Sequence, residues 1–155
     1  MIKAAGRVWG RANVSYVYVI VIDSHIYIGE TGGLPPIRWA QHLSKEGTLA
    51  SKLLALGMEP PGTDEILFVC VRCTLIDSLK PNMQKRARRL IEEELHRQFC
   101  LDARMLGEEF KIVSEPPPPS VRFTWTFDSA DVARRIRAHV AKEFESWKKE
   151  TSSTI

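Results

Sequence analysis

The sequence predicts an α/β fold of the α+β type, with a small, mainly antiparallel sheet that starts with a β-hairpin and is flanked by helices. The first observation is a stretch rich in β-branched and aromatic residues, 16–29, interrupted only by Asp23-Ser24. The second is a continuous apolar run over 66–75. The third is a pair of long helical patterns, over 82–99 and 129–149. We therefore expect a sheet covered by helices, with a C-terminal strand–helix extension.

The composition is that of one globular domain. The chain has 155 residues, of which 44% are hydrophobic and 26% charged, and its net charge of +3 neither requires nor excludes nucleic acid. Three cysteines, an odd number, argue against a disulfide framework and for a reducing compartment. No apolar segment has the length of a signal-peptide core with its cleavage site, or of a membrane span. We expect a cytoplasmic protein with no membrane partner.

The chain divides into three parts by composition. Residues 1–13 form a basic N-terminal arm, which either is a solvated terminus or contacts phosphates. Residues 14–115 form the main domain. Residues 116–155 comprise a proline-rich connector, a strand over 121–127 and the last helix. We expect this extension to pack on the same domain, and a homodimer through it is the alternative.

The stretch 16–29 predicts a tight hairpin with Asp23-Ser24 as its turn. In that register the facing pairs are Ile22 with His25, Ile20 with Tyr27, and Tyr18 with Gly29. Side chains alternate between the two faces of a strand. Three phenols and a glycine therefore share one side of the hairpin: Tyr16, Tyr18, Tyr27 and Gly29. The absent side chain of Gly29 is expected to leave open space beside the phenols.

Two short helices follow the hairpin. Pro35-Pro36 can start a helix but cannot continue one, so we expect a helix over 37–43. Thr48 is expected to cap a second helix over 49–56, which Gly57 ends.

The second half of the chain contains three longer elements. The apolar run over 66–75 predicts a central strand that is buried on both faces, and 77–81 predicts a turn. The helix over 82–99 has a basic first half and an acidic middle, formed by Lys85, Arg86, Arg88 and Arg89, then Glu92, Glu93 and Glu94. Basic residues near a helix N-terminus oppose the macrodipole, a conflict tolerated where a polyanion binds. The last helix, which Ser129 opens, has an apolar stripe of Val132, Ile136, Val140 and Phe144.

Two further polar residues indicate chemistry. Arg38 and His42 are four residues apart, so a helix places both on one face. The forked donors of an arginine match phosphate oxygens, and an imidazole binds phosphate or orients a water. Phenols, a guanidinium and an imidazole around one gap suit recognition and cleavage of a phosphodiester. The alternative for each residue is a surface or packing role.

These residues resemble the motif of the GIY-YIG nucleases, which consists of a first-strand Tyr, a second-strand Tyr-Ile-Gly and an Arg-x-x-x-His on the next helix. The chain has Tyr16-Val-Tyr18, Tyr27-Ile-Gly29 and Arg38-Trp-Ala-Gln-His42. The resemblance covers residues 14–43 strongly and 83–102 weakly. It implies a metal-dependent endonuclease that hydrolyses DNA. The motif Tyr would act as the general base or orient it, Arg38 would contact the scissile phosphate, and one Glu of a later helix would hold Mg²⁺ or Mn²⁺.

The resemblance leaves alternatives at two positions. Tyr18 fits the local strand pattern and Tyr16 fits the usual spacing to Tyr27, and we favour Tyr18. The segment Leu90-Ile-Glu92-Glu-Glu-Leu95 is similar to the family's pattern around the metal ligand, which indicates Glu92. A helical wheel instead places Glu94 inside the apolar stripe, where an acid is unusual without a partner or metal. We rank Glu92 before Glu94, and a solvated acidic face is the alternative to both.

The chain departs from the family pattern in three places. Tyr16 or Val14 replaces the first Gly, one extra residue lies between Gly29 and Arg38, and no Asn follows the Glu helix, where Asp102 is the nearest polar residue. The missing Asn supports a second hypothesis from another class, a catalytically weak or inactive nucleic-acid-binding module with the same fold.

Other His and Cys residues have simpler interpretations. His25 is either a basic group near the second-strand Tyr or a solvated turn residue. Cys70-x-x-Cys73 and His96-x-x-x-Cys100 contain the ligand types of zinc. A strand offset of three puts the first two on opposite faces, and a helical wheel puts His96 outside the buried stripe. We therefore expect core cysteines rather than a zinc-stabilised interaction domain.

Overall fold

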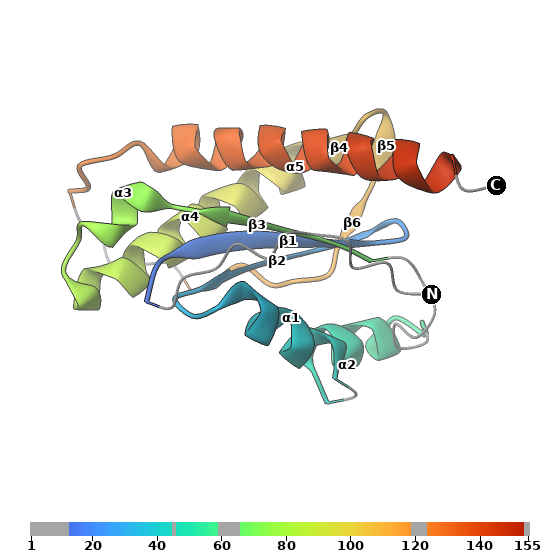
Figure 1. The fold of residues 1–155 in the computed structure, drawn as a ribbon, viewed down its shortest axis with the longest axis horizontal. Coiled ribbons are helices and arrows are strands. Elements are labelled where there is room, and N and C mark those ends of the chain that lie inside the picture. The colour runs from blue at the N-terminus through green and yellow to red at the C-terminus, as the bar shows by residue number, and fades with distance from the viewer. Residues whose placement is uncertain (1–12, 45, 59–65, 119–123, 154–155) are drawn as a thin grey trace.

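The structure is a computed structural model that describes residues 13–44, 46–58, 66–118 and 124–153. Its main sheet has four strands in the order β3-β1-β2-β6: β1 is Tyr16–Ile22, β2 is His25–Thr31, β3 is Ile66–Arg72 and β6 is Lys111–Ile112 (Figure 1). β1 runs antiparallel to both of its neighbours, and β6 is parallel to β2. Two further short strands, β4 (Arg104–Met105) and β5 (Glu108–Glu109), pair with each other. The predicted fold class, a helix-flanked and mainly antiparallel sheet, is confirmed.

The hairpin has the predicted register. Tyr18 faces Gly29, Ile20 faces Tyr27 and Ile22 faces His25. Asp23 has a φ of 47°, the left-handed conformation that Asp tolerates in tight turns. Local pairing between β-rich segments therefore decides this part of the fold.

The prediction for 66–75 is wrong in position. β3 ends at Arg72, and Thr74–Asp77 forms a short helix, α3. β3 lies at the edge of the sheet and has only Val69 buried, so the expected burial on both faces is also wrong, whereas β1 is central and all seven of its residues are buried. An apolar run indicates burial by the layers above and below a strand, and it carries no information on which strands lie beside it.

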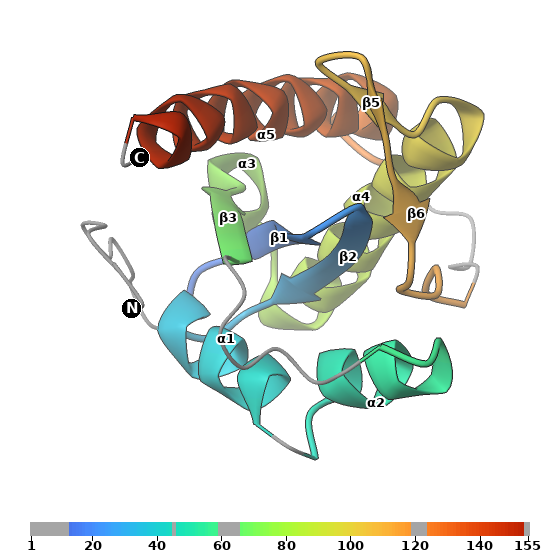
Figure 2. The same ribbon diagram turned by 90° about the vertical axis from the view of Figure 1, so that its right-hand side faces the viewer.

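Helices cover both faces of the sheet. α4 (Pro81–Leu101) and α5 (Ser129–Ser152) cover one face, and α1 (Pro35–Leu43) and α2 (Thr48–Ala55) cover the other (Figure 2). Alternate residues of β1 pack against the two helix layers. Val17, Val19 and Val21 pack in the cluster with α4 and α5, whereas Tyr18, Ile20 and Ile22 pack in the cluster with α2. Burial of each of these aliphatic side chains contributes roughly 1.5–3 kcal/mol, so β1 anchors both layers.

Some helix ends differ from the predicted ones. α2 starts at Thr48 with Gly47 at the N-cap, so Thr48 does not cap it. α4 begins at Pro81, in place of part of the predicted turn, and continues to Leu101. Asp128 caps α5 by accepting hydrogen bonds from the Ala130 and Asp131 amides.

The C-terminal helix packs on α4 and β3. Its buried residues are Ala133, Ile136, Val140 and Phe144, with Val132 half-buried beside them. Within the predicted strand 121–127, residues 124–127 form no strand and 121–123 lie outside the described residues, as does the basic arm up to residue 12. No helix in the described ranges combines the length and the apolar character needed to cross a bilayer.

Candidate functional site

The phenol of Tyr18 fills the space above Gly29. A Cβ atom placed on Gly29 would overlap the Tyr18 hydroxyl, because these two residues face each other across the hairpin. The expectation of an open gap at Gly29 is therefore wrong at this point. The glycine therefore leaves room for the phenol end of Tyr18 to lie directly over β2.

The Tyr18 hydroxyl meets His42 of α1. The phenol oxygen lies 2.7 Å from Nε2 of His42, and the ring of Tyr27 packs against the same imidazole with a centroid distance of 4.6 Å. His42 is buried, with 2% of its surface exposed, which rules out a solvated surface histidine. The structure thus brings three of the sequence-predicted residues together on one face of the sheet.

Tyr16 lies away from this cluster. It occupies the same face of β1 two residues before Tyr18, but it is buried opposite Thr31. Tyr18 is therefore the first-strand tyrosine at the site. His25 lies at the turn end of β2, opposite Ile22, and contributes no contact to the imidazole of His42.

The cluster of Tyr18 and His42 is neutral at pH 7. Burial raises the pKa of the Tyr18 phenol above its ordinary value, so the hydroxyl keeps its proton. Burial, followed by the nearby charge of Arg38, lowers the pKa of His42 to about 4. We assign the phenol O–H as donor to Nε2, because both groups are neutral and the phenol retains its hydrogen. The imidazole proton then lies on Nδ1.

Several nitrogens near the site are buried without a hydrogen-bond acceptor among the described residues. Two of them, Nε of Arg38 and Nδ1 of His42, come from the same face of α1. The third on this helix, Nε1 of Trp39, belongs to a ring stacked on Phe68 of β3, so it faces a different neighbour. An unsatisfied buried donor costs roughly 1–3 kcal/mol. Two such donors side by side are therefore suited to an anion.

Glu92 of α4 reaches the same region. Its carboxyl group is mostly buried and makes no hydrogen bond or ion pair within the part of the chain that the structure describes. Burial, and then the charge of Glu30, raise its pKa to about 8, while Arg89 and Arg38 act in the opposite direction. Burial, and then the charge of Glu92, raise the pKa of the Tyr27 phenol. Arg38 of α1 and Glu92 of α4 therefore lie within electrostatic range of each other, although their helices cover opposite faces of the sheet.

Glu94 interacts with other residues of α4 and not with the site. Its carboxylate accepts hydrogen bonds from Arg97 and Gln98, which lower its pKa. Gln98 also donates to the Ala130 carbonyl of α5, so these contacts join two helices. The partners account for an acid within the apolar stripe, and Glu94 is not available to the site.

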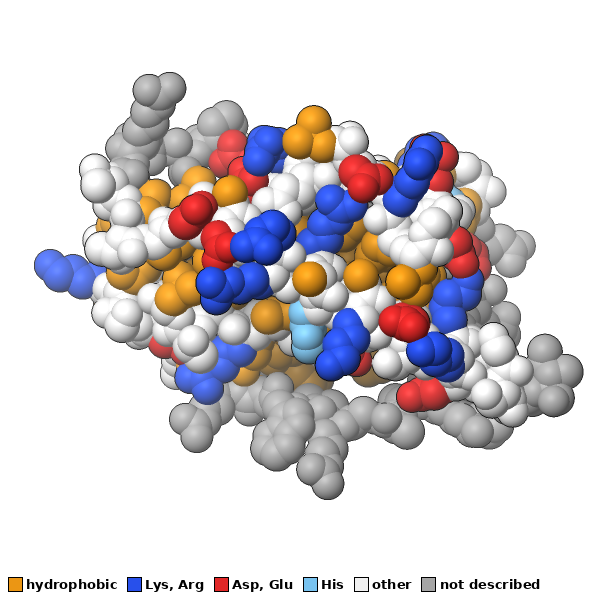
Figure 3. Space-filling model, turned by 90° about the horizontal axis from the view of Figure 1, so that it is seen from above, with side chains coloured by type: hydrophobic (Ala, Val, Ile, Leu, Met, Phe, Trp, Pro, Cys, Tyr) orange, Lys and Arg blue, Asp and Glu red, His pale blue; other side chains and the backbone are white. Residues whose placement is uncertain are grey.

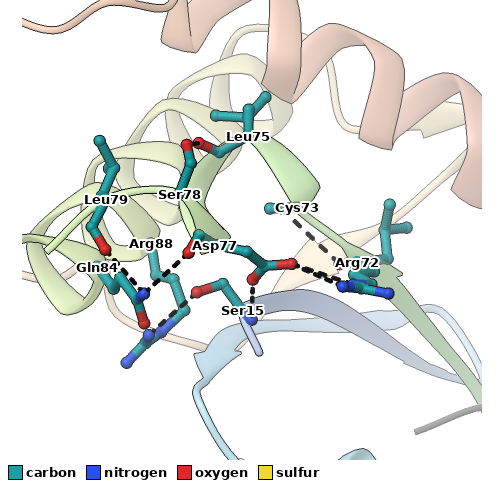
Figure 4. Close-up of polar contacts among 10 residues, drawn as sticks. Ser15, Arg72, Cys73, Leu75, Asp77, Ser78, Leu79, Gln84 and Arg88 are labelled. Carbon is teal, nitrogen blue, oxygen red and sulfur yellow. Dashed lines mark hydrogen bonds and ion pairs between the residues drawn. The ribbon is translucent and has the colours of Figure 1, made fainter. Parts of the chain in front are cut away.

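Arg88, one of the basic residues in the first half of α4, is buried and holds α4 against the sheet one turn before Glu92. Its Nε lies 2.5 Å from Oε2 of Glu30 on β2, and its Nη1 donates to Ser15. Ser15 also donates its amide to Asp77, which pairs with Arg72 of β3 (Figure 4). A helical wheel could have found Arg88, since it lies next to buried Ala87 and one turn before Ile91.

His96 also holds α4 against the sheet, one turn after Glu92. Ser114 accepts the Ile28 amide hydrogen and donates its own to Nε2 of His96, whose Nδ1 donates to the Glu92 carbonyl. The prediction that His96 lies outside the buried stripe is wrong, because this polar partner compensates its burial. No sequence signal marks Ser114, which is remote from both partners along the chain.

A zinc site is not formed by the cysteines. Cys70 packs with the cluster of α2 and Cys73 with that of α4 and α5, on opposite faces as predicted, and Cys100 is exposed. Among the described residues no group of three or more His, Cys, Asp or Glu side chains is placed to hold a metal ion.

No family model, no curated protein and no solved structure matches this chain.

Proposed function

We propose that this protein is a metal-dependent endonuclease that hydrolyses DNA phosphodiester bonds. The observation that carries the proposal is the pair of buried donors without acceptors among the described residues, Nε of Arg38 and Nδ1 of His42, together with the mostly buried acid Glu92, which lies within electrostatic range of Arg38. Donors without acceptors favour a phosphate, and an acid without a partner favours a cation. The resemblance of the same residues to the GIY-YIG motif supports this interpretation.

Each side chain has a distinct role in the proposal. Arg38 and His42 hold the non-bridging oxygens of the scissile phosphate. Tyr18, whose exposed fraction is 1%, donates to Nε2 of His42 and so keeps the imidazole hydrogen on Nδ1, directed at the phosphate. Tyr27 is half-buried and is the phenol that an attacking water can reach. Its oxygen accepts a hydrogen bond from that water and orients it.

Glu92 is the residue that would hold Mg²⁺ or Mn²⁺. Glu30 is engaged by Arg88, so one carboxylate remains, and Mg²⁺ is commonly held by one or two carboxylates together with waters and substrate phosphates. The bound ion would stabilise negative charge on the phosphate oxygens. Glu92 loses a proton when it takes up this role, because its pKa of about 8 leaves it mainly protonated at pH 7.

A plasmid-nicking assay tests the proposal. Purified protein with Mg²⁺ or Mn²⁺ is expected to convert supercoiled plasmid to the open-circular form, and Arg38→Ala and Glu92→Gln are expected to abolish this. Nicking that both variants retain would mean a contaminant or a wrong site. Chelation of the divalent cation should stop cleavage by the wild type.

A nucleic-acid-binding module that does not cut is the second candidate. The neutral form of Glu92 at pH 7 and the missing Asn favour it over other non-enzymatic functions. DNA binding that depends on Arg38, without nicking at any pH between 7 and 9 in either metal, would establish this candidate and reject the enzyme.

A further inference from the structure

The first half of α4 is strongly basic. Residues 78–91 include five basic residues and no acid. Arg88 is buried against Glu30, but three of the others, Lys85, Arg86 and Arg89, are exposed on the helix. We call these three residues the α4 basic face. Lys80, at the N-cap, extends it by one turn.

Part of the charge of this face has no acidic partner among the described residues. Many cations elsewhere form ion pairs, including Arg134 and Arg135 with Asp131, Lys148 with Glu108, Lys149 with Glu145, Arg97 with Glu94, and Lys52 with Glu115. Exposed Arg104, Lys111 and Lys142 form none with the described residues. On the face that carries α5, blue and red side chains are accordingly interspersed (Figure 3). Lys85 and Arg89 form no ion pair with any described residue. Lys80 at the N-cap opposes the helix macrodipole, and α4 has no acid in its first turn to offset it.

The α4 basic face leads into the candidate site. Arg89 is three residues before Glu92, and its charge lowers the pKa of that carboxyl group. The neighbouring Arg88 lies against Gly32, in the loop that joins β2 to the helix bearing Arg38. Lys85 and Glu92 are seven residues apart, about 10 Å of helix. This distance corresponds to roughly three nucleotides of one strand of duplex DNA.

We propose that the α4 basic face binds the phosphate backbone of duplex DNA beside the scissile phosphate. The inference rests on the proposed function for its orientation, since the site defines where the scissile phosphate lies. The ligand is a duplex rather than a single strand, because residues 78–91 contain no aromatic side chain on which unpaired bases could stack. Lysine and arginine without base-reading partners contact phosphates independently of sequence.

Salt-dependent binding by an uncleaving protein tests the surface. Glu92→Gln protein is titrated onto a fluorescein-labelled duplex at several salt concentrations, and fluorescence anisotropy gives the affinity. Each phosphate contact contributes about −0.9 to the slope of log affinity against log salt. Adding Lys85→Ala and Arg89→Ala is expected to make the slope less steep by about 1.8. The matched control adds Arg134→Ala and Lys142→Ala on α5, which removes the same charge, and should leave the slope unchanged.

The outcomes separate this inference from the proposed function. An unchanged slope in the α4 variant, or an equal change in the α5 control, would show that the α4 basic face does not bind DNA phosphates, even if wild-type protein nicks plasmid. A slope change confined to the α4 variant supports the surface even if wild-type protein nicks nothing. Unlabelled single-stranded DNA or duplex RNA that competes as well as duplex DNA overturns the choice of ligand. Circular dichroism of each variant confirms that the helix content is retained.

Discussion

The Tyr18 hydroxyl lies 2.7 Å from Nε2 of His42, and this contact joins the central strand to α1 across 24 residues of sequence. It is buried, and both partners are neutral at pH 7. Because the hydrogen bond holds the imidazole in one orientation and one tautomer, it determines which nitrogen is presented to a ligand. The contact therefore connects the packing of the sheet with the chemistry proposed for the site.

Replacing Tyr18 by Phe should reduce nicking by at least tenfold, because His42 loses the partner that orients it. The bare Nε2 would also be buried without a hydrogen bond, at a cost of about 1–3 kcal/mol in the free energy of unfolding. Plasmid nicking and urea unfolding measure the two effects. Tyr16→Phe is the comparison on the same strand face. A larger loss of nicking in Tyr16→Phe than in Tyr18→Phe would reassign the motif tyrosine.

Replacing Gly29 by Ala should destabilise the fold by about 1–3 kcal/mol, because the new methyl group overlaps the Tyr18 hydroxyl. Gly33→Ala is the matched control, since a Cβ there meets only Oγ1 of Thr31 at an ordinary 3.6 Å. Urea unfolding at pH 7 compares the two variants. Equal midpoints would show that the phenol does not occupy the space above Gly29.

Glu92 should contribute stability to the metal-free protein that is lost between about pH 4.5 and pH 8, whereas the lowered pKa of His42 acts in the opposite direction up to about pH 6.5. The folded state raises the pKa of Glu92 from 4.5 to about 8, so it binds more protons than the unfolded state in this range. The contribution is fully present below pH 4.5 and lost above pH 8, with a slope of up to about 1.4 kcal/mol per pH unit. Urea unfolding across this range measures it. Glu92→Gln removes this contribution, so the free energy of unfolding of the wild type minus that of the variant should fall as the pH rises, and an identical slope in both proteins would exclude a perturbed Glu92.

Replacing Arg88 by Met should cost about 3–5 kcal/mol of stability, because Glu30 would keep a mostly buried charge without its partner. Arg89→Met changes the same residue type at an exposed neighbour and should stay within about 0.5 kcal/mol of the wild type. In the double variant with Glu30→Met, the loss should be smaller than the sum of the single losses. Additive losses would mean that the two side chains do not stabilise each other.

The sequence could indicate the candidate residues of the site but not the contacts between them. The helical spacing of Arg38 and His42 predicts a shared face, which α1 has. The burial of His42 depends on Tyr18 and Tyr27 of the hairpin, and no local pattern predicts it. Glu94 illustrates the opposite case. A helical wheel makes Glu94 a candidate metal ligand, but its carboxylate already accepts hydrogen bonds from Arg97 and Gln98 and is not available to the site.

The sequence by itself determined the hairpin, its register and the set of residues on each of its faces, because two adjacent strands joined by a two-residue turn can pair in few ways. Only the tertiary structure decided that β3 takes the edge, that Tyr18 covers Gly29, and that Ser114 supports His96. These features depend on segments far apart in the chain; the Ile28 amide and Ser114, for example, are separated by 86 residues. Their positions follow from how all the layers pack together, and alternation or periodicity within one segment carries no record of that packing.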